Sequence, residues 1–167
     1  MYEKLLIVKV DSNYCDYLRK FDNKVTYNAW KKELRPFIGV LFIIDKCEYF
    51  APLSSPKEKH KGIPNKLDFL KIDNGKLGAI NLNNMIPVTI NNYKEFDLNK
   101  KVSTKEEQKR IDLLSNQLRW LTANREKLIS NSNLLYNLYK SHKLNDNVVN
   151  RCCNFILLEK KCKEYNK

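Results

Sequence analysis

The spacing of hydrophobic residues along the chain changes near residue 103. Before it, short runs rich in Leu, Ile, Val and Phe alternate with polar turns, a pattern typical of β-strands. After it, hydrophobic residues recur every three or four positions, as on the buried face of a helix. The pattern therefore predicts an α+β fold, in which a small, strongly curved β-sheet or barrel has a helical layer packed against it.

The N-terminal segment predicts a strand followed by a short helix. Residues 3–10 are rich in Leu, Ile and Val and form the strand candidate. Asp11 or Ser12 can cap the helix, because a short polar side chain there accepts a hydrogen bond from a free backbone amide. The predicted buried face of this helix consists of Tyr14, Leu18 and Phe21, which recur at helical spacing.

The longest apolar run, residues 35–44, is predicted to be the best-buried strand. Asp45-Lys46 should turn it into a second strand over residues 47–53, so that the two form a hairpin. Further strands or mixed segments are expected at residues 67–72 and 77–90.

Three helices are expected in the C-terminal part. Thr104 and Glu107 fit a capping box that begins the first, and the others are expected over residues 132–143 and 147–165. The spacing places these residues on the buried faces: Ile111, Leu114, Leu118 and Leu121; Leu134, Leu135, Leu138 and Tyr139; Val149, Cys153, Ile156 and Leu157. Since no linker or repeat interrupts the chain, residues 1–167 are predicted to form a single domain.

Charge narrows the classes of partner. The chain carries 31 Lys and Arg against 19 Asp and Glu, a formal charge of +12, which predicts attraction to a polyanion such as nucleic acid or an anionic membrane. A membrane is less favoured, because no long apolar segment or signal peptide is present. The five cysteines are odd in number and include no Cys-x-x-Cys pair, which favours reduced thiols in the cytoplasm over disulfides or a zinc site.

The segment from Phe50 to His60 concentrates candidate chemistry. It places Ser54, Ser55 and Lys57 on a proline-stiffened loop directly after a strand. Hydroxyl and ammonium groups suit a phosphate, because they donate hydrogen bonds and offset negative charge. The alternative is an ordinary serine turn with solvated lysines.

Six ordered segments resemble the ToxN/AbiQ endoribonuclease toxins of bacterial type III toxin–antitoxin systems. Together they cover most of the chain. They are Tyr14-x-x-Tyr17-Leu18-x-x-Phe21-Asp22-x-Lys24-Val25, Phe37-Ile-Gly-Val40, Tyr49-x-Ala-Pro-Leu-Ser-Ser-Pro-Lys57-x-x-His60, Leu77-Gly-x-Ile80-Asn-Leu82-x-x-Met85-Ile-Pro87, Gln117-Leu-x-Trp120 with Ala123-Asn124, and Cys153-Asn-Phe-x-Leu-Leu-Glu159.

The resemblance implies a compact fold related to the MazF/Kid toxins, with a strongly twisted antiparallel sheet or barrel and a C-terminal helical layer. It also implies a sequence-selective RNA cleavage that needs no metal or other cofactor. The expected products are a 2′,3′-cyclic phosphate and a 5′-hydroxyl. The expected partner is a small, repeated and pseudoknotted antitoxin RNA, which the toxin cuts into single repeats and which then inhibits it in a closed toxin–RNA assembly. Cellular or phage RNA would be the substrate, and growth arrest or abortive infection in the bacterial cytoplasm the outcome.

Carried over by position, the resemblance also implies a set of site residues. Ser55 and Lys57 match the family's active-site hydroxyl and lysine, and Ser54 stands where a threonine is common. Arg35 falls where a lysine often precedes the buried strand, and Tyr14 matches a tyrosine near the active groove. For Tyr14, a place in the core is the alternative, because it shares a helix face with Leu18 and Phe21.

The residue types fit such a cleavage. Lys57 can offset the charge that develops on phosphate oxygens, and Arg35 can hold a phosphate through two parallel hydrogen bonds. Ser55 is expected to orient the phosphate or the 2′-hydroxyl. His60 has a pKa suited to proton transfer, although it also fits a histidine on a surface loop. No cluster of acidic residues suggests a metal site.

Basic and aromatic residues near the motif are candidates for RNA binding, because cations attract phosphate and aromatic rings stack on bases. Either Tyr27 or Trp30 is expected to supply an active-site aromatic. The predicted RNA-binding residues are Lys24, Tyr27, Trp30, Lys31, Lys32 and Lys59. Two other functions stay open on the sequence: a non-catalytic RNA-binding protein with the same basic groove, and a MazF-like toxin with a protein antitoxin.

Overall fold

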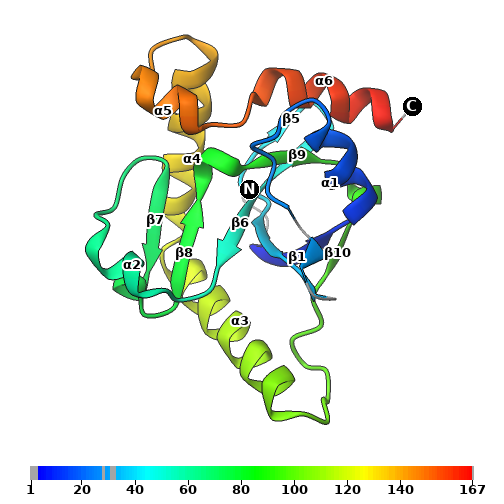
Figure 1. The fold of residues 1–167 in the computed structure, drawn as a ribbon, viewed down its shortest axis with the longest axis vertical. Coiled ribbons are helices and arrows are strands. Elements are labelled where there is room, and N and C mark those ends of the chain that lie inside the picture. Colours follow the sequence, from blue (N-terminus) through cyan, green and yellow to red (C-terminus); the bar gives the residue numbers. More distant parts are fainter. Residues whose placement is uncertain (1–3, 28, 31–32, 167) are drawn as a thin grey trace.

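The computed structural model describes residues 4–27, 29–30 and 33–166. Within them, an eight-stranded antiparallel sheet has the strand order β10-β1-β4-β6-β8-β7, and β5 and β9 also pair with β6 (Figure 1). The strands are β1 (Leu6–Val10), β4 (Pro36–Gly39), β5 (Ile43–Ile44), β6 (Cys47–Ser54), β7 (Phe69–Ile72), β8 (Gly78–Asn81), β9 (Ile86–Val88) and β10 (Tyr93–Glu95). A separate two-stranded ribbon joins β2 (Ala29–Trp30) to β3 (Glu33–Leu34).

Strand β6 connects the two halves of the sheet. Its first half pairs with β5 and β9, its middle with β4, and its last residues, Leu53 and Ser54, with Ile80 and Ala79 of β8. Every residue of β6 except Glu48 is buried, which explains its nearly continuous apolar sequence. The predicted strand over residues 47–53 is therefore confirmed, and it delivers the Ser54–Lys57 loop from the middle of the sheet.

The apolar run at residues 35–44 is not one buried strand, so that prediction is wrong in its second half. The run divides into β4 and β5, and Ile43 is 51% exposed. Gly39 ends β4 directly over the ring of Phe50, where a Cβ would stand 2.5 Å from a ring carbon. The predicted hairpin is confirmed, since Ile44 pairs with Cys47 across the turn.

The helices are α1 (Ser12–Arg19), α2 (Glu58–Gly62), α3 (Lys105–Ala123), α4 (Arg125–Lys140), α5 (Asp146–Arg151) and α6 (Phe155–Tyr165), with 3₁₀ turns η1 (Asp73–Gly75), η2 (Leu82–Asn84) and η3 (Ile90–Asn92). Two predicted N-caps are confirmed: the Asp11 carboxylate accepts a hydrogen bond from the amide of Asn13, and the Thr104 hydroxyl accepts one from the amide of Glu107. In Figure 1, α4 passes behind β8, and α6 lies next to β9 and α1.

The second and third predicted helices differ from the structure. Helix α4 already begins at Arg125, and the third helix divides into α5 and α6. Asn154 stabilises the break between α5 and α6. Its backbone amide donates a hydrogen bond to the Asp22 carboxylate, and its side-chain oxygen caps α6 by accepting one from the backbone amide of Leu157. Because α6 begins anew after this break, its buried face differs from that of one continuous helix. Phe155 is buried, whereas Ile156, which was predicted to be buried, is exposed. Other side chains predicted as buried but found exposed are Phe21 and Leu134.

All five cysteines are buried free thiols. None of the helices in the described part of the chain is long and apolar enough to cross a membrane.

Candidate active site

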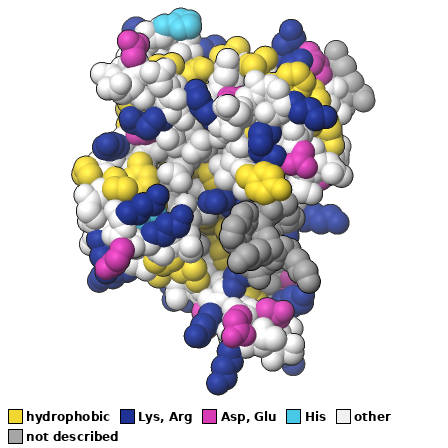
Figure 2. Space-filling model, viewed as in Figure 1, with side chains coloured by type: hydrophobic (Ala, Val, Ile, Leu, Met, Phe, Trp, Pro, Cys, Tyr) yellow, Lys and Arg dark blue, Asp and Glu magenta, His cyan; other side chains and the backbone are white. Residues whose placement is uncertain are grey.

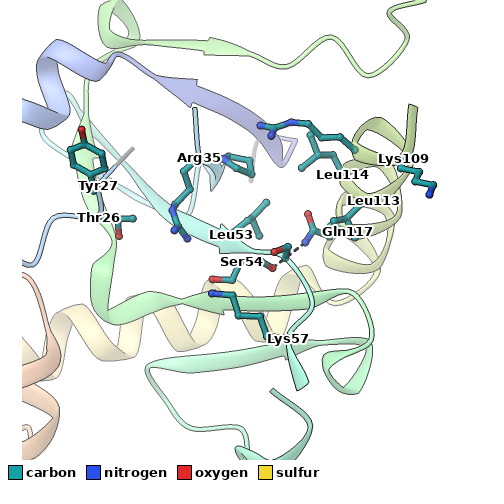
Figure 3. Close-up of a pocket in the computed structure, with 13 residues that line it drawn as sticks. Thr26, Tyr27, Arg35, Leu53, Ser54, Lys57, Lys109, Leu113, Leu114 and Gln117 are labelled. Carbon is teal, nitrogen blue, oxygen red and sulfur yellow. Dashed lines mark hydrogen bonds between the residues drawn. The ribbon is translucent and has the colours of Figure 1, made fainter. Parts of the chain in front are cut away.

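A groove of about 720 Å³ opens where β6 ends, between the sheet and α3 (Figure 3). Its walls come from four separate segments: the link after α1, the entry to β4, the end of β6 with its loop, and one face of α3. The lining residues are Thr26, Tyr27, Arg35, Pro36, Leu53, Ser54, Ser55, Lys57, Lys109, Arg110, Leu113, Leu114 and Gln117.

The end of β6 positions the hydroxyls of Ser54 and Ser55 and the ammonium group of Lys57. Ser54 is the last strand residue and is paired with Ala79, while the side-chain amide of Asn81 donates to its hydroxyl over 3.4 Å. The next three residues lead into α2, with Lys57 in extended geometry at its N-cap position. Ser55 and Lys57 therefore lie on the loop after the strand, as the sequence predicts, whereas Ser54 still belongs to the strand. All three line the groove.

The groove is positively charged. Arg35, Lys57, Lys109 and Arg110 line it, and no Asp or Glu is among the described residues that do so. Arg35 is partly buried, and the loss of solvation lowers its pKa from its usual value. In Figure 3 the guanidinium of Arg35 points toward Ser54 and Lys57, whereas Lys109 points away from them. Cations and hydroxyls that converge in this way suit an anion such as a phosphate.

The same face of the molecule carries further cations. Figure 2 shows Lys and Arg side chains over α2 and toward the middle of this face. Lys59, a predicted RNA-binding residue, is exposed on α2 but does not line the groove. Lys24, another, donates to the carbonyl of Cys152 over 3.1 Å and lies in a separate hollow beside α1.

Of the two predicted aromatics, Tyr27 lines the groove. Tyr27 is 56% exposed, and the guanidinium of Arg19 lies over its ring, 4.8 Å from the ring centre. The side chain of Trp30 and all of Lys31 and Lys32 lie outside the described residues.

Tyr14 and His60 are not brought to the groove. Tyr14 is fully buried, donates from its hydroxyl to the carbonyl of Pro87 and packs on the ring of Tyr165, which favours its place in the core. His60 is only 3% exposed and packs against Phe69, so its interpretation as a surface-loop histidine is wrong. Burial, followed by the charges of Lys57 and Lys59, lowers its pKa below the usual value.

The sequence did not identify Thr26, Lys109, Arg110 and Gln117 as groove residues. The two cations belong to a helix whose charges resemble an ordinary solvated face, so nothing in the pattern marks them. Gln117 does carry a signal: it is a polar residue that shares the buried face of α3 with Leu114 and Leu121.

Residues 6–163 match the family model for the toxin ToxN of type III toxin–antitoxin systems. The chain belongs to this family. It is 34% identical to the endoribonuclease ToxN of Pectobacterium atrosepticum over 166 residues, which cover 95% of this chain and 92% of the relative. It is 32% identical to the endoribonuclease ToxN of Bacillus thuringiensis subsp. kurstaki over 164 residues, which cover 93% and 81%. The resemblance to ToxN and AbiQ is thus confirmed.

Solved structures of related toxins share the fold of this ToxN family member. One, from work on selective toxin inhibition by a non-coding RNA pseudoknot, has a TM-score of 0.83 at 28% identity and covers 99% of both chains. Another is AbiQ, a lactococcal anti-phage endoribonuclease of a type III system, with a TM-score of 0.81 at 26% identity, covering 98% of this chain and 99% of AbiQ. These matches agree with the predicted α+β class and its antiparallel sheet.

Proposed function

We propose that this toxin is a metal-independent, sequence-selective endoribonuclease whose active site is the groove at the end of β6. The observation that carries the proposal is the convergence of Arg35, Ser54, Ser55 and Lys57 on one surface free of lining carboxylates among the described residues. It is supported by the relatives named endoribonuclease ToxN, which align with nearly the whole chain.

The proposed reaction uses the 2′-oxygen of the RNA itself. This oxygen loses its proton and attacks the neighbouring phosphorus, the bond from phosphorus to the 5′-oxygen breaks, and that oxygen gains a proton. The products are a 2′,3′-cyclic phosphate and a 5′-hydroxyl. Negative charge builds up on the phosphate oxygens in the transition state. Lys57 and Arg35 would therefore stabilise the transition state more than the ground state.

Ser55, with Ser54 beside it, would orient the phosphate or the 2′-hydroxyl by hydrogen bonding. Lys57 is also the candidate for moving a proton. Tyr27, exposed at the groove, would stack on a base next to the scissile bond. His60 is given no role, since it lies outside the groove lining.

The proposed inhibitor is a small, repeated antitoxin RNA that the toxin processes and then holds in a closed toxin–RNA assembly. Support comes from the structural neighbour inhibited by an RNA pseudoknot and from the net charge of +12. Cellular or phage RNA in the bacterial cytoplasm would be the substrate, in keeping with the anti-phage role of AbiQ. The same proposal includes two features of the fold: a sheet related to that of the MazF/Kid toxins, and a C-terminal helical layer.

The test is to incubate the purified protein with a mixed-sequence RNA in EDTA and to identify the end groups of the fragments. We expect cyclic phosphates and 5′-hydroxyls, and we expect Lys57→Ala to abolish them. Lys61→Ala is the matched control, because Lys61 lies on α2, is exposed and forms an ion pair with Glu58 one turn before it on the same helix. Cleavage that requires magnesium would overturn the metal-independent reaction. Intact RNA that still shifts on a gel would identify a non-catalytic RNA-binding protein.

A further inference from the structure

Gln117 connects three segments of the candidate site. It projects from α3 and is 1% exposed. Its side-chain nitrogen donates to the carbonyl of Leu77 over 2.7 Å and to the carbonyl of Ser54 over 3.4 Å (Figure 3). One amide therefore fastens the end of β6 and the entry of β8 to the helix on the other side of the groove.

The position of these bonds matters because the strand pairing of β6 ends there. Ser54 is the last residue paired with β8, and the peptide that follows its carbonyl leads to Ser55. The bond from Gln117 thus acts on the peptide directly before the proposed catalytic loop. A shift of this peptide would move Ser55 and Lys57 together.

The environment of the Gln117 side-chain oxygen indicates that packing alone does not explain a glutamine at this position. This oxygen is buried and has no hydrogen-bond partner among the described residues. A buried acceptor without a partner costs on the order of 1–3 kcal/mol, which an apolar side chain of the same size would not incur. The other buried residues of α3, Leu114 and Leu121, are apolar as expected. The donated bonds explain why a glutamine occupies this site.

We propose that Gln117 is a positioning residue of the endoribonuclease: through the Ser54 carbonyl it holds the Ser54–Lys57 loop in its reactive geometry. The inference rests on the proposed function for the roles of Ser55 and Lys57. Gln117 itself does not need to touch the RNA. Its loss should slow the chemical step more than it weakens RNA binding, because a small displacement of catalytic groups can cost a factor of about 100 in rate.

The test compares Gln117→Met, which keeps the size and removes both donated bonds, with Leu121→Met as the control at a buried position of the same helix. Three quantities are measured: the kcat of cleavage of a short RNA, the KM of the same reaction, and the hydrogen exchange of the backbone amides of Ser54, Ser55 and Lys57. For Gln117→Met we expect kcat to fall roughly ten- to hundredfold, KM to stay within about twofold and exchange to accelerate. Leu121→Met should leave all three near the wild-type values.

Gln117→Glu carries the test if the methionine variant does not fold. Its ionised carboxylate has the shape of the amide but cannot donate, whereas the protonated acid regains one donor. Its activity relative to the wild type should therefore rise as the pH falls.

The measurements distinguish failure of the role proposed for Gln117 from failure of the proposed function. Wild-type kcat and unchanged exchange in Gln117→Met, or a flat relative pH profile in a slowed Gln117→Glu, would overturn the role of Gln117 and leave the proposed function intact. A wild-type protein that does not cleave RNA would overturn the proposed function, while exchange, which needs no activity, would still decide whether Gln117 holds the loop.

Discussion

Gly78 lies so close to Ser54 that a Cβ at residue 78 would stand 2.0 Å from the Ser54 carbonyl oxygen. Gly78 also has a φ of +109°, which side chains rarely adopt. The same carbonyl accepts the bond from Gln117, so a glycine and a glutamine together determine where β6 ends. The geometry of the candidate site thus depends on backbone packing as well as on its charged side chains.

Gly78→Ala should damage both stability and the groove. The positive φ and the clash with a backbone atom cannot be relieved by rotating a side chain, and each such strain costs on the order of 1–3 kcal/mol. We expect the free energy of unfolding, measured by chemical denaturation, to fall by at least that amount. Gly62→Ala is the matched control, since nothing lies within 4 Å of its added Cβ. Equal stability of the two variants would contradict this account of Gly78.

Arg35 should act through the geometry of its guanidinium as well as its charge. Arg35→Ala is expected to lower kcat/KM for RNA cleavage by about 100-fold, the scale on which a positioned donor to developing charge contributes. Arg35→Lys should recover only part of this loss, because an ammonium cannot hold a phosphate through two parallel bonds. Lys66→Ala, at an exposed position outside the groove, is the control. Full activity in Arg35→Lys would show that charge alone suffices.

The sequence predicts local features well where one residue's chemistry decides them. The caps at Asp11 and Thr104, the turn at Asp45-Lys46 and the loop that carries Ser55 and Lys57 all have this character. Such features depend on backbone geometry and hydrogen bonds formed within a few residues.

Features decided by distant parts of the chain were not predicted. The break before α6 depends on Asp22, which accepts from the amide of Asn154 more than a hundred positions away. Likewise, the burial of His60 comes from packing on Phe69 and against Gly75. The role of Gln117 as a groove wall depends on its partner carbonyls at Ser54 and Leu77. Spacing along one helix contains no information about such tertiary partners.

His60 should make the folded state sensitive to mild acid. Its pKa is lowered in the folded protein, so between the unfolded value of about 6.5 and the lower folded value the unfolded chain binds a proton that the folded chain does not. The free energy of unfolding should therefore decrease as the pH falls through this interval, and His60→Asn should remove that part of the dependence.

The control is His142→Asn, which changes a histidine in the turn after α4 that already has a positive φ suited to asparagine. Denaturation curves at several pH values between 4 and 8 test the difference. The same pH slope in His60→Asn as in the wild type would rule out His60 as its source.

The buried pair of Tyr49 and Glu159 should affect stability without affecting cleavage. The Tyr49 hydroxyl donates to the Glu159 carboxylate over 2.5 Å, which joins β6 to α6, and burial followed by this carboxylate raises the pKa of Tyr49. Glu159→Ala should lower the free energy of unfolding by about 1–3 kcal/mol, because it leaves a buried hydroxyl without its main acceptor. Glu164→Ala, on the exposed side of α6, should change it by less than about 0.5 kcal/mol. Neither residue lines the groove, so kcat per folded molecule, measured well below the melting temperature, should match the wild type in both variants. A selective loss of kcat in Glu159→Ala would mean that the α6 end of β6 is coupled to the loop at its other end.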